Sequence, residues 1–116
     1  MPRSYLEYLR HISDEIKFIL NISKNLSYAE FENDEILKRA AVRSIEIIGE
    51  ATKKIPTNFR DKYSHIDWRS ISGMRDKLIH DYFGIDYEIV WDVMLNKIPV
   101  LKKEIDKIIQ NETTPK

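Results

Sequence analysis

The sequence contains no cysteine, so disulfide bonds and thiolate metal sites are excluded. It has no run approaching the ~18 apolar residues of a membrane-spanning helix. Its first residues, MPRSYLEYLR, lack the apolar core of a secretory leader. The three histidines are scattered and do not have the spacing of a zinc site. We therefore expect a cytoplasmic protein with no membrane contact and no bound metal.

The chain also lacks an excess of charge of either sign, because 19 Lys and Arg residues balance 19 Asp and Glu residues. A protein that grips nucleic acid by bulk charge needs many Lys and Arg contacts with phosphates. The composition argues against that mode of binding. A local basic patch, or one built by two chains together, stays compatible with it.

Glycine and proline are scarce, at three and four residues, while one third of the 116 residues are charged. This composition is typical of helical proteins, and the length suggests one domain. We expect a single domain over residues 1–110 and a disordered tail over residues 111–116.

Apolar residues recur at the three- and four-residue spacing of amphipathic helices in four stretches of the chain. These stretches are residues 4–26, 34–55, 67–82 and 86–109. A connector at 57–66 has room for one short helical turn. Pro99 lies inside the last stretch and should kink or split it. We therefore predict an all-α fold, an antiparallel, up-and-down four-helix bundle with a short extra helical turn.

Arg75 is out of place on the helix predicted over 67–82. At about 100° per residue, Arg75 and Tyr82 fall inside the apolar arc of that helix. The arc consists of Trp68, Ile71, Met74, Leu78 and Ile79. A guanidinium on a core-facing position is costly unless it is paired. Either a carboxylate such as Glu46 or Glu50 holds Arg75 in a purely structural pair, or the arc opens onto a groove where Arg75 meets an anion.

His80 lies elsewhere on the same predicted helix. It follows Arg75 by five residues and is therefore about 140° around a straight helix. Gly73 shares a line with His80 and permits close approach of a partner helix. Either the helix ends or bends near His80, or two chains meet in one cleft. We favour two chains, because acid–base catalysis needs one group to take a proton and another to donate one, and a two-fold dimer supplies two copies of His80.

Other candidate sites are weaker. His11 and His65 are expected to be solvated surface residues. The segment GEATKK, which begins at Gly49, lacks the glycine spacing of a phosphate-binding loop.

Arg75, His80 and Tyr82 form an Arg-x-x-x-x-His-x-Tyr motif within RDKLIHDY. Four longer blocks surround it in order. They are RSIEIIGEA (43–51), IDWRSISGMRDKLIHDYFGID (66–86), VW (90–91) and IPVLKKEI (98–105). Together they resemble the HEPN family, and specifically the HepT-like ribonuclease toxins of type VII toxin–antitoxin systems. Those toxins pair with a minimal nucleotidyltransferase (MNT) antitoxin. The resemblance covers nearly the whole chain.

The resemblance implies a dimerising HEPN bundle with a composite cleft that receives the motif from both chains. Arg75 and His80 are then the catalytic pair of a metal-independent endoribonuclease. Tyr82 positions the substrate and is the residue on which the antitoxin places AMP, and Gly73 and Asp76 support the cleft and the dimer. The implied partners are RNA, a second copy of the chain and the antitoxin. No cofactor is implied, because ATP serves the antitoxin as AMP donor.

Two other interpretations fit the same residues. One is a non-catalytic HEPN module that binds a nucleotide or docks a nucleotidyltransferase. The other is a structural helical domain in which Arg75 forms only an internal ion pair.

Overall fold

The computed structural model describes residues 3–79 and 84–114, and its regular elements there are helices. They are α1 (Arg3–Ser23), α2 (Tyr28–Glu32), α3 (Glu35–Lys53), α4 (Thr57–Lys62), α5 (Trp68–Ser72), α6 (Met74–Leu78), α7 (Tyr87–Asp92), the π-helical segment η2 (Val93–Lys97) and α8 (Ile98–Thr113). The predicted all-α class is confirmed. Over the described residues, no helix is long and apolar enough to cross a membrane.

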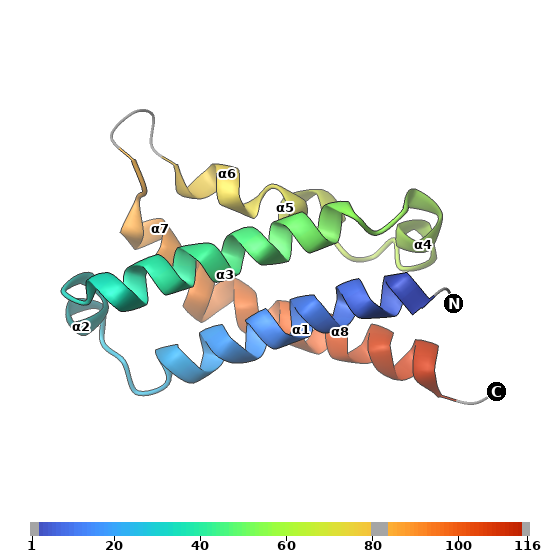
Figure 1. The fold of residues 1–116 in the computed structure, drawn as a ribbon, viewed down its shortest axis with the longest axis horizontal. Coiled ribbons are helices and arrows are strands. Elements are labelled where there is room, and N and C mark those ends of the chain that lie inside the picture. Colours follow the sequence, from blue (N-terminus) through green and yellow to red (C-terminus); the bar gives the residue numbers. More distant parts are fainter. Residues whose placement is uncertain (1–2, 80–83, 115–116) are drawn as a thin grey trace.

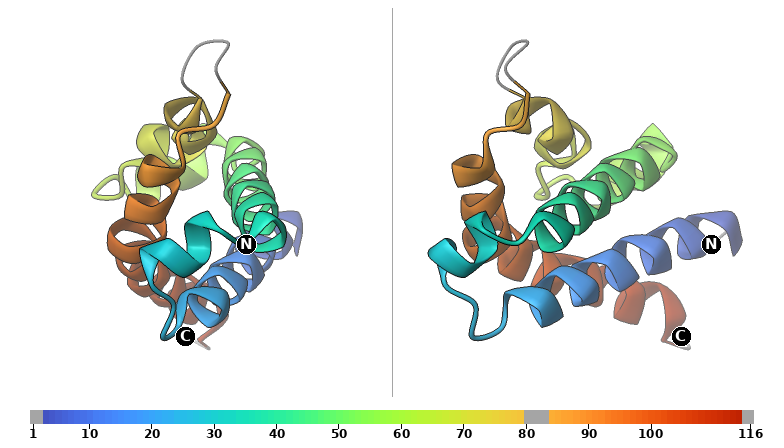
Figure 2. Two further views of the ribbon diagram at one scale, coloured as in Figure 1. Left: turned by 90° about the vertical axis from the view of Figure 1, so that its left-hand side faces the viewer. Right: turned by 60° about the vertical axis from the view of Figure 1, so that its left-hand side comes forward.

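The long helices lie alongside one another. In Figure 1 the chain runs leftward along α1, rightward along α3, leftward along α5 and α6, and rightward from α7 through α8. α1 packs against both α3 and α8, and α3 also contacts α5 and α6. The nearly end-on view in Figure 2 (left) shows these helices gathered around a common interior.

One hydrophobic core fills that interior. α1 contributes Leu9, Ile12, Ile16 and Ile19, which recur every three or four residues and are all buried. This spacing places them on a single face of the helix. The core side chains of the other long helices are Ala41, Ile45 and Ile48 of α3 and Ile98, Leu101, Ile105 and Ile108 of α8.

Helix α2 lies between the first two predicted helical stretches, in a segment for which no helix was predicted. A reciprocal capping box begins it, in which the Glu30 N–H donates to the Ser27 hydroxyl and the Ser27 N–H donates to the Glu30 carboxylate. Phe31 is fully buried, and its ring centroid lies 5.4 Å from that of Trp91. The short helix therefore closes one end of the core.

The connector at 57–66 contains α4, which corresponds to the short extra helical turn that the sequence predicted. Arg60 of this helix donates from Nε to the Ile55 carbonyl at 2.9 Å and from Nη2 to the Thr52 carbonyl at 2.6 Å. The last carbonyls of a helix have no partner within the helix itself. Arg60 therefore satisfies carbonyls at the end of α3 and fixes where the chain turns.

The helix predicted over 67–82 is interrupted and shorter than expected. Gly73 separates α5 from α6, and α6 ends at Leu78. A Cβ added at Gly49 of α3 would lie 3.2 Å from the backbone oxygen of Ser72. Within the chain, Gly49 is therefore a point where two helices approach closely, and an approach of a second chain at Gly73 stays a prediction.

The last predicted helix is continuous but not uniform. Pro99 lies in the first turn of α8, directly after the π-helical turn. Because proline has no N–H, it cannot bond the carbonyl four residues earlier, that of Leu95. The Ile98 N–H instead reaches back five residues to the Val93 carbonyl.

The C-terminal end of α8 extends through Thr113, beyond the boundary at residue 110 that we expected. Glu112 accepts hydrogen bonds from Lys62 at 2.7 Å and from the Tyr63 hydroxyl. Asn111 donates to the Tyr63 hydroxyl at 2.6 Å. These bonds tie the end of α8 to α4.

Candidate functional site

Arg75 is held by a carboxylate of the neighbouring long helix. Its Nε donates to Glu46 Oε2 of α3 at 2.9 Å. The side chain of Arg75 is 53% exposed and that of Glu46 is 23% exposed. A guanidinium has five N–H donors arranged as a planar fork. Among the described residues only its Nε–H has a partner, so the other donors are available to an anion.

The expected core-facing position of Arg75 is wrong, because Arg75 is exposed. The prediction placed residues 67–82 around one straight helix. The break at Gly73 instead turns α6 about its own axis relative to α5. Met74 and Leu78 keep the core face of α6, and Arg75 turns toward the outer edge of α3. Of the two carboxylates expected to pair with it, Glu46 does so. Glu50 lies 3.5 Å from Arg43 on α3 itself.

Gly73 and Asp76 flank Arg75. Gly73 is both the C-cap of α5 and the N-cap of α6, with φ −96°. Its carbonyl accepts a hydrogen bond from the Asp76 N–H at 3.1 Å. The Asp76 side chain is exposed in the first turn of α6. Together Gly73 and Asp76 begin α6 in an orientation that leaves the Arg75 side chain exposed. A role in a dimer stays a prediction.

His80 and Tyr82 lie outside the described residues. The chain on either side of them is tied together, because Ile79 forms an antiparallel bridge with Ile85 and the Asp86 N–H donates to the Leu78 carbonyl at 2.7 Å. Gly84 has φ +94°, a conformation that side-chain-bearing residues rarely adopt. The residues beside the motif therefore form a specified structure, in which α6 stops before His80. This agrees with the first of our two alternatives for the helix, that it ends near His80.

Asp86 begins the next helix. Its carboxylate accepts the backbone N–H groups of Glu88 and Ile89 at the start of α7. Sequence reasoning used Asp86 only as a helix boundary and missed that its backbone also joins the two sides of the motif. The cap was readable from an aspartate before an apolar helix, but the pairing with Leu78 was not.

The remaining histidines behave as expected. His11 and His65 are both exposed. Within residues 3–79 and 84–114, no three His, Asp or Glu side chains gather as a metal-ligand set.

A family model and several similar proteins all carry descriptions as ribonucleases. The sequence model described as "Ribonuclease HepT-like" matches residues 12–108, a range that contains the whole motif. A protein of Caldanaerobacter subterraneus subsp. tengcongensis named "Putative RNase TTE0752" is 50% identical over 111 residues, covering 96% of each chain. The "Probable ribonuclease HepT" of Thermococcus cleftensis is 39% identical over 108 residues, covering 93% of this chain and 98% of the relative. No solved structure matches the chain.

Proposed function

The chain belongs to the HepT-like ribonuclease family, and from that membership we propose that it is a metal-independent endoribonuclease whose active site contains Arg75, His80 and Tyr82. The observation that carries the proposal is the oriented, exposed guanidinium of Arg75. It lies on the short helix that ends two residues before His80.

The roles follow from the chemistry of the three side chains. Arg75 binds the scissile phosphate and stabilises the charge that grows on its oxygens. His80 has an ordinary pKa of ~6.5 and can accept or donate a proton near neutrality. One imidazole takes the proton of the ribose 2′-OH, which attacks the phosphorus, and a second protonates the leaving 5′-oxygen. The products are a 2′,3′-cyclic phosphate and a 5′-hydroxyl.

The two proton transfers are best served by a homodimer. One chain has a single motif histidine, and two chains related by a two-fold axis bring two to one cleft. Exposed apolar side chains near the motif support such pairing. Ile79, which precedes His80, is 40% exposed and Ile89 of α7 is 38% exposed.

Regulation by a nucleotidyltransferase antitoxin is the second half of the proposal. The antitoxin transfers AMP from ATP to the Tyr82 hydroxyl and releases pyrophosphate. The added phosphate brings negative charge and bulk beside Arg75, where the RNA phosphate must bind. RNA cleavage is then blocked while the protein stays folded, which is the behaviour of the toxin half of a toxin–antitoxin pair.

A purely structural role for Arg75 is the weaker alternative. Exposed ion pairs contribute only about 0.2–1 kcal/mol to stability, and more than half of the Arg75 side chain is exposed. The pair with Glu46 therefore adds little to folding. Its geometry is better explained as orienting the guanidinium for a ligand.

The decisive experiment measures cleavage of a labelled single-stranded RNA in EDTA by wild type, Arg75→Ala and His80→Ala. His11→Ala serves as a matched control, since that histidine is exposed on α1. We expect cleavage to cyclic-phosphate ends by wild type and the control only, with all four proteins giving the same circular dichroism spectrum. Cleavage that EDTA abolishes and magnesium restores would exclude the metal-independent mechanism. Salt-dependent RNA binding with no turnover would favour the non-catalytic module.

A further inference from the structure

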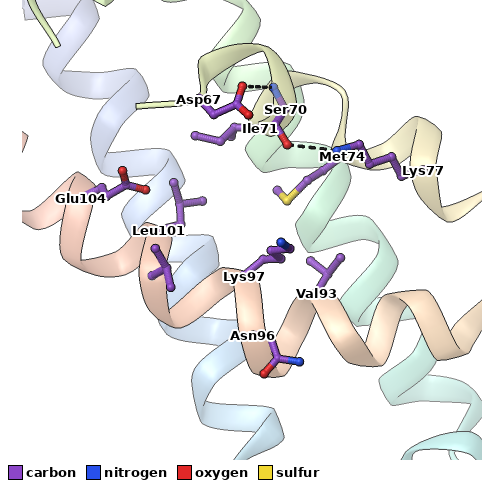
Figure 3. A pocket seen from close by; sticks show the side chains of 11 residues that line it. Asp67, Ser70, Ile71, Met74, Lys77, Val93, Asn96, Lys97, Leu101 and Glu104 are labelled. Atoms are coloured by element: carbon purple, nitrogen blue, oxygen red, sulfur yellow. Dashed lines mark hydrogen bonds between the residues drawn. The ribbon is translucent and has the colours of Figure 1, made fainter. Parts of the chain in front are cut away.

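A pocket of about 280 Å³ lies between α5 and α6 on one side and η2 and α8 on the other (Figure 3). Its volume is near the lower end of the roughly 300–1,000 Å³ typical of small-molecule sites. Arg75, which is the proposed active-site residue within the described part of the chain, does not line it. Met74 and Lys77 do, and they bracket Arg75 on α6.

The floor of the pocket is apolar. Ile71, Met74 and Leu101 line it, and each is buried in the core. A thioether beside branched aliphatic side chains forms a polarizable surface that suits a flat aromatic ring. The floor therefore favours a ligand that has a planar, apolar face.

Two ammonium groups border the same floor. Lys77 Nζ donates to the Ser70 hydroxyl at 3.0 Å, and Lys97 projects from the end of the π-helical turn. Among the described residues, neither lysine has a carboxylate within ion-pair distance. Glu104 lies at the left end of the pocket in Figure 3, Lys97 near its middle and Lys77 on its right-hand side. The pocket thus combines two ammonium groups and an apolar floor with two carboxylates, Glu104 and Asp67, of which Asp67 already accepts the Ser70 N–H at the start of α5.

The π-helical turn helps to shape this pocket. Val93, Asn96 and Lys97 of η2 all line it, together with residues of the first turns of α8. A π-helical turn is rare and is found disproportionately at functional sites. Pro99 accounts for a disturbed helix here. The pocket gives the disturbance a second consequence, because the Lys97 ammonium group at the end of the turn borders the same cavity.

We propose that this pocket binds one nucleotide of the single-stranded RNA substrate, beside the nucleotide that is cleaved. The base lies on Ile71, Met74 and Leu101, and its phosphate meets Lys77 and Lys97. Glu104 accepts a hydrogen bond from a base amino group, as carboxylates do in base recognition. The pocket then disfavours uracil, which has no amino group. This inference rests on the proposed function, since it concerns the RNA of that same reaction.

The position of the pocket suits a neighbouring nucleotide. Arg75 and Lys77 lie two residues apart on α6, and so at about 200° around the helix. A single strand crossing α6 therefore meets Arg75 on one side and the pocket on the other. The pocket would contribute to where along a sequence the chain cuts.

Methyl NMR tests the site directly with an uncleavable RNA. The probe is a short 2′-O-methyl oligoadenylate, titrated into protein carrying ¹³C-labelled Met, Ile and Leu methyl groups. We expect chemical shift changes at Met74, Ile71 and Leu101. We expect none at Ile36, which is exposed in the first turn of α3. AMP alone serves as a separate arm, and oligouridylate should bind more weakly than oligoadenylate.

Charge variants test the two lysines. Lys77→Gln combined with Lys97→Gln should weaken RNA affinity roughly tenfold. It should also lower the log–log salt slope by about 0.7, the contribution of one phosphate contact on a single strand. Lys103→Gln combined with Lys107→Gln removes the same charge from exposed positions of α8 outside the pocket, and should change affinity less than twofold.

Filling the pocket tests its shape without changing charge. Val100 lines the pocket and is largely exposed, so Val100→Trp adds bulk without disturbing the core. It should weaken RNA binding severalfold, whereas Val100→Ala should leave affinity unchanged.

The outcomes separate this inference from the proposed function. RNA cleavage with unshifted pocket methyl groups, or with both lysine pairs behaving alike, overturns the subsite and leaves the ribonuclease intact. Shifts with AMP but not with RNA overturn it in favour of a free-nucleotide site. Shifts produced only by the antitoxin identify a protein-docking pocket instead. Absence of any RNA binding or cleavage removes both proposals.

Discussion

The ion pair between Arg75 and Glu46 shows how an exposed contact can matter to function while contributing little to stability. Its Nε–Oε2 distance of 2.9 Å fixes one edge of the guanidinium. Exposed pairs of this kind are worth about 0.2–1 kcal/mol. The stronger effect is on orientation, because a catalytic group displaced by about an ångström can lose much of its rate advantage.

Glu46→Gln should therefore lower the cleavage rate about tenfold while the melting temperature changes little. The amide can still accept from Nε, but it lacks the charge that holds the guanidinium. Steady-state kinetics should show the loss mainly in kcat, since substrate can still reach Arg75. Glu50→Gln is the matched control, because Glu50 faces Arg43 instead. A large fall in melting temperature for Glu46→Gln alone would assign the pair to folding.

Sequence reasoning identified Glu46 as one of two partners for Arg75 but placed Arg75 on the wrong side of the helix. Helical periodicity measures rotation from a fixed start, and Gly73 introduces a new start. The sequence ISGMRD does not indicate whether Gly73 lies inside one helix or between two helices. The assignment of His80 and Tyr82 rests on the motif alone, since both lie outside the described residues.

At the scale of elements, two of the four predicted helical stretches are single helices, α1 and α3, whereas one is interrupted at Gly73 and one continues through a π-helical turn. The long amphipathic stretches were predictable because their apolar spacing is regular, as in Leu9, Ile12, Ile16 and Ile19 of α1. α2 was missed although Ser27 and Glu30 spell a capping box. Its single buried anchor, Phe31, gives no periodicity to detect. Tertiary contact with Trp91 decides that helix.

The contact between α3 and α5 depends on the missing side chain of Gly49. Alanine normally stabilises a helix interior by about 1 kcal/mol relative to glycine. At this position the new Cβ would lie 3.2 Å from the Ser72 backbone oxygen, which cannot rotate away. We expect Gly49→Ala to lower the free energy of unfolding by about 1 kcal/mol in urea denaturation.

Gly73→Ala provides the comparison for that variant. Its φ of −96° is accessible to alanine, and among the described residues its new Cβ would meet the Arg69 carbonyl oxygen at 3.3 Å and no other atom within 4 Å. The change in unfolding free energy should be smaller than for Gly49→Ala. Equal or reversed effects would show that α5 moves freely against α3.

The junction between α4 and α8 should make the fold sensitive to acid. Burial raises the pKa of Glu112, but hydrogen bonds from Lys62 and Tyr63 outweigh it and hold the pKa below its ordinary value. A carboxyl group with a lowered pKa in the folded state stabilises the protein above its unfolded pKa. That stabilisation is lost as the pH falls through the folded value.

Melting temperatures measured from pH 7 to pH 3 should therefore fall more steeply for wild type than for Glu112→Gln, with the difference concentrated below about pH 4.5. Glu104→Gln is a suitable control, because Glu104 has no ion-pair partner among the described residues. Parallel curves for wild type and Glu112→Gln would mean that the junction opens in solution.

At the scale of the whole molecule, the central question is whether one cleft uses two copies of His80. α3, which carries Glu46, runs along the longest axis of the chain (Figure 1), whose extents are 49 × 30 × 21 Å. A second copy placed along that side would have a long surface to cover. For the two motifs to share one cleft, that surface must also include the end of α6, where the exposed Ile79 precedes His80.

A shared cleft predicts that inactive chains suppress active ones. Wild type mixed with a tenfold excess of His80→Ala, with time for subunits to exchange and RNA in large excess, should retain roughly a tenth of its activity. Nearly every wild-type chain would then be paired with an inactive one. Full activity in this mixture would mean that each chain cuts RNA with its own histidine.

The π-helical turn at Val93–Lys97 affects which deletions the fold can tolerate during evolution. A π turn contains one residue more than the α turn that it replaces. Losing one residue of α8 ahead of Ile105 would rotate the downstream apolar face by about 100° and pull Ile105 and Ile108 out of the core. Losing one within Val93–Lys97 would convert the turn to an α turn and leave that face in register. This segment is therefore where a single-codon deletion can be absorbed, at the cost of the pocket beside it.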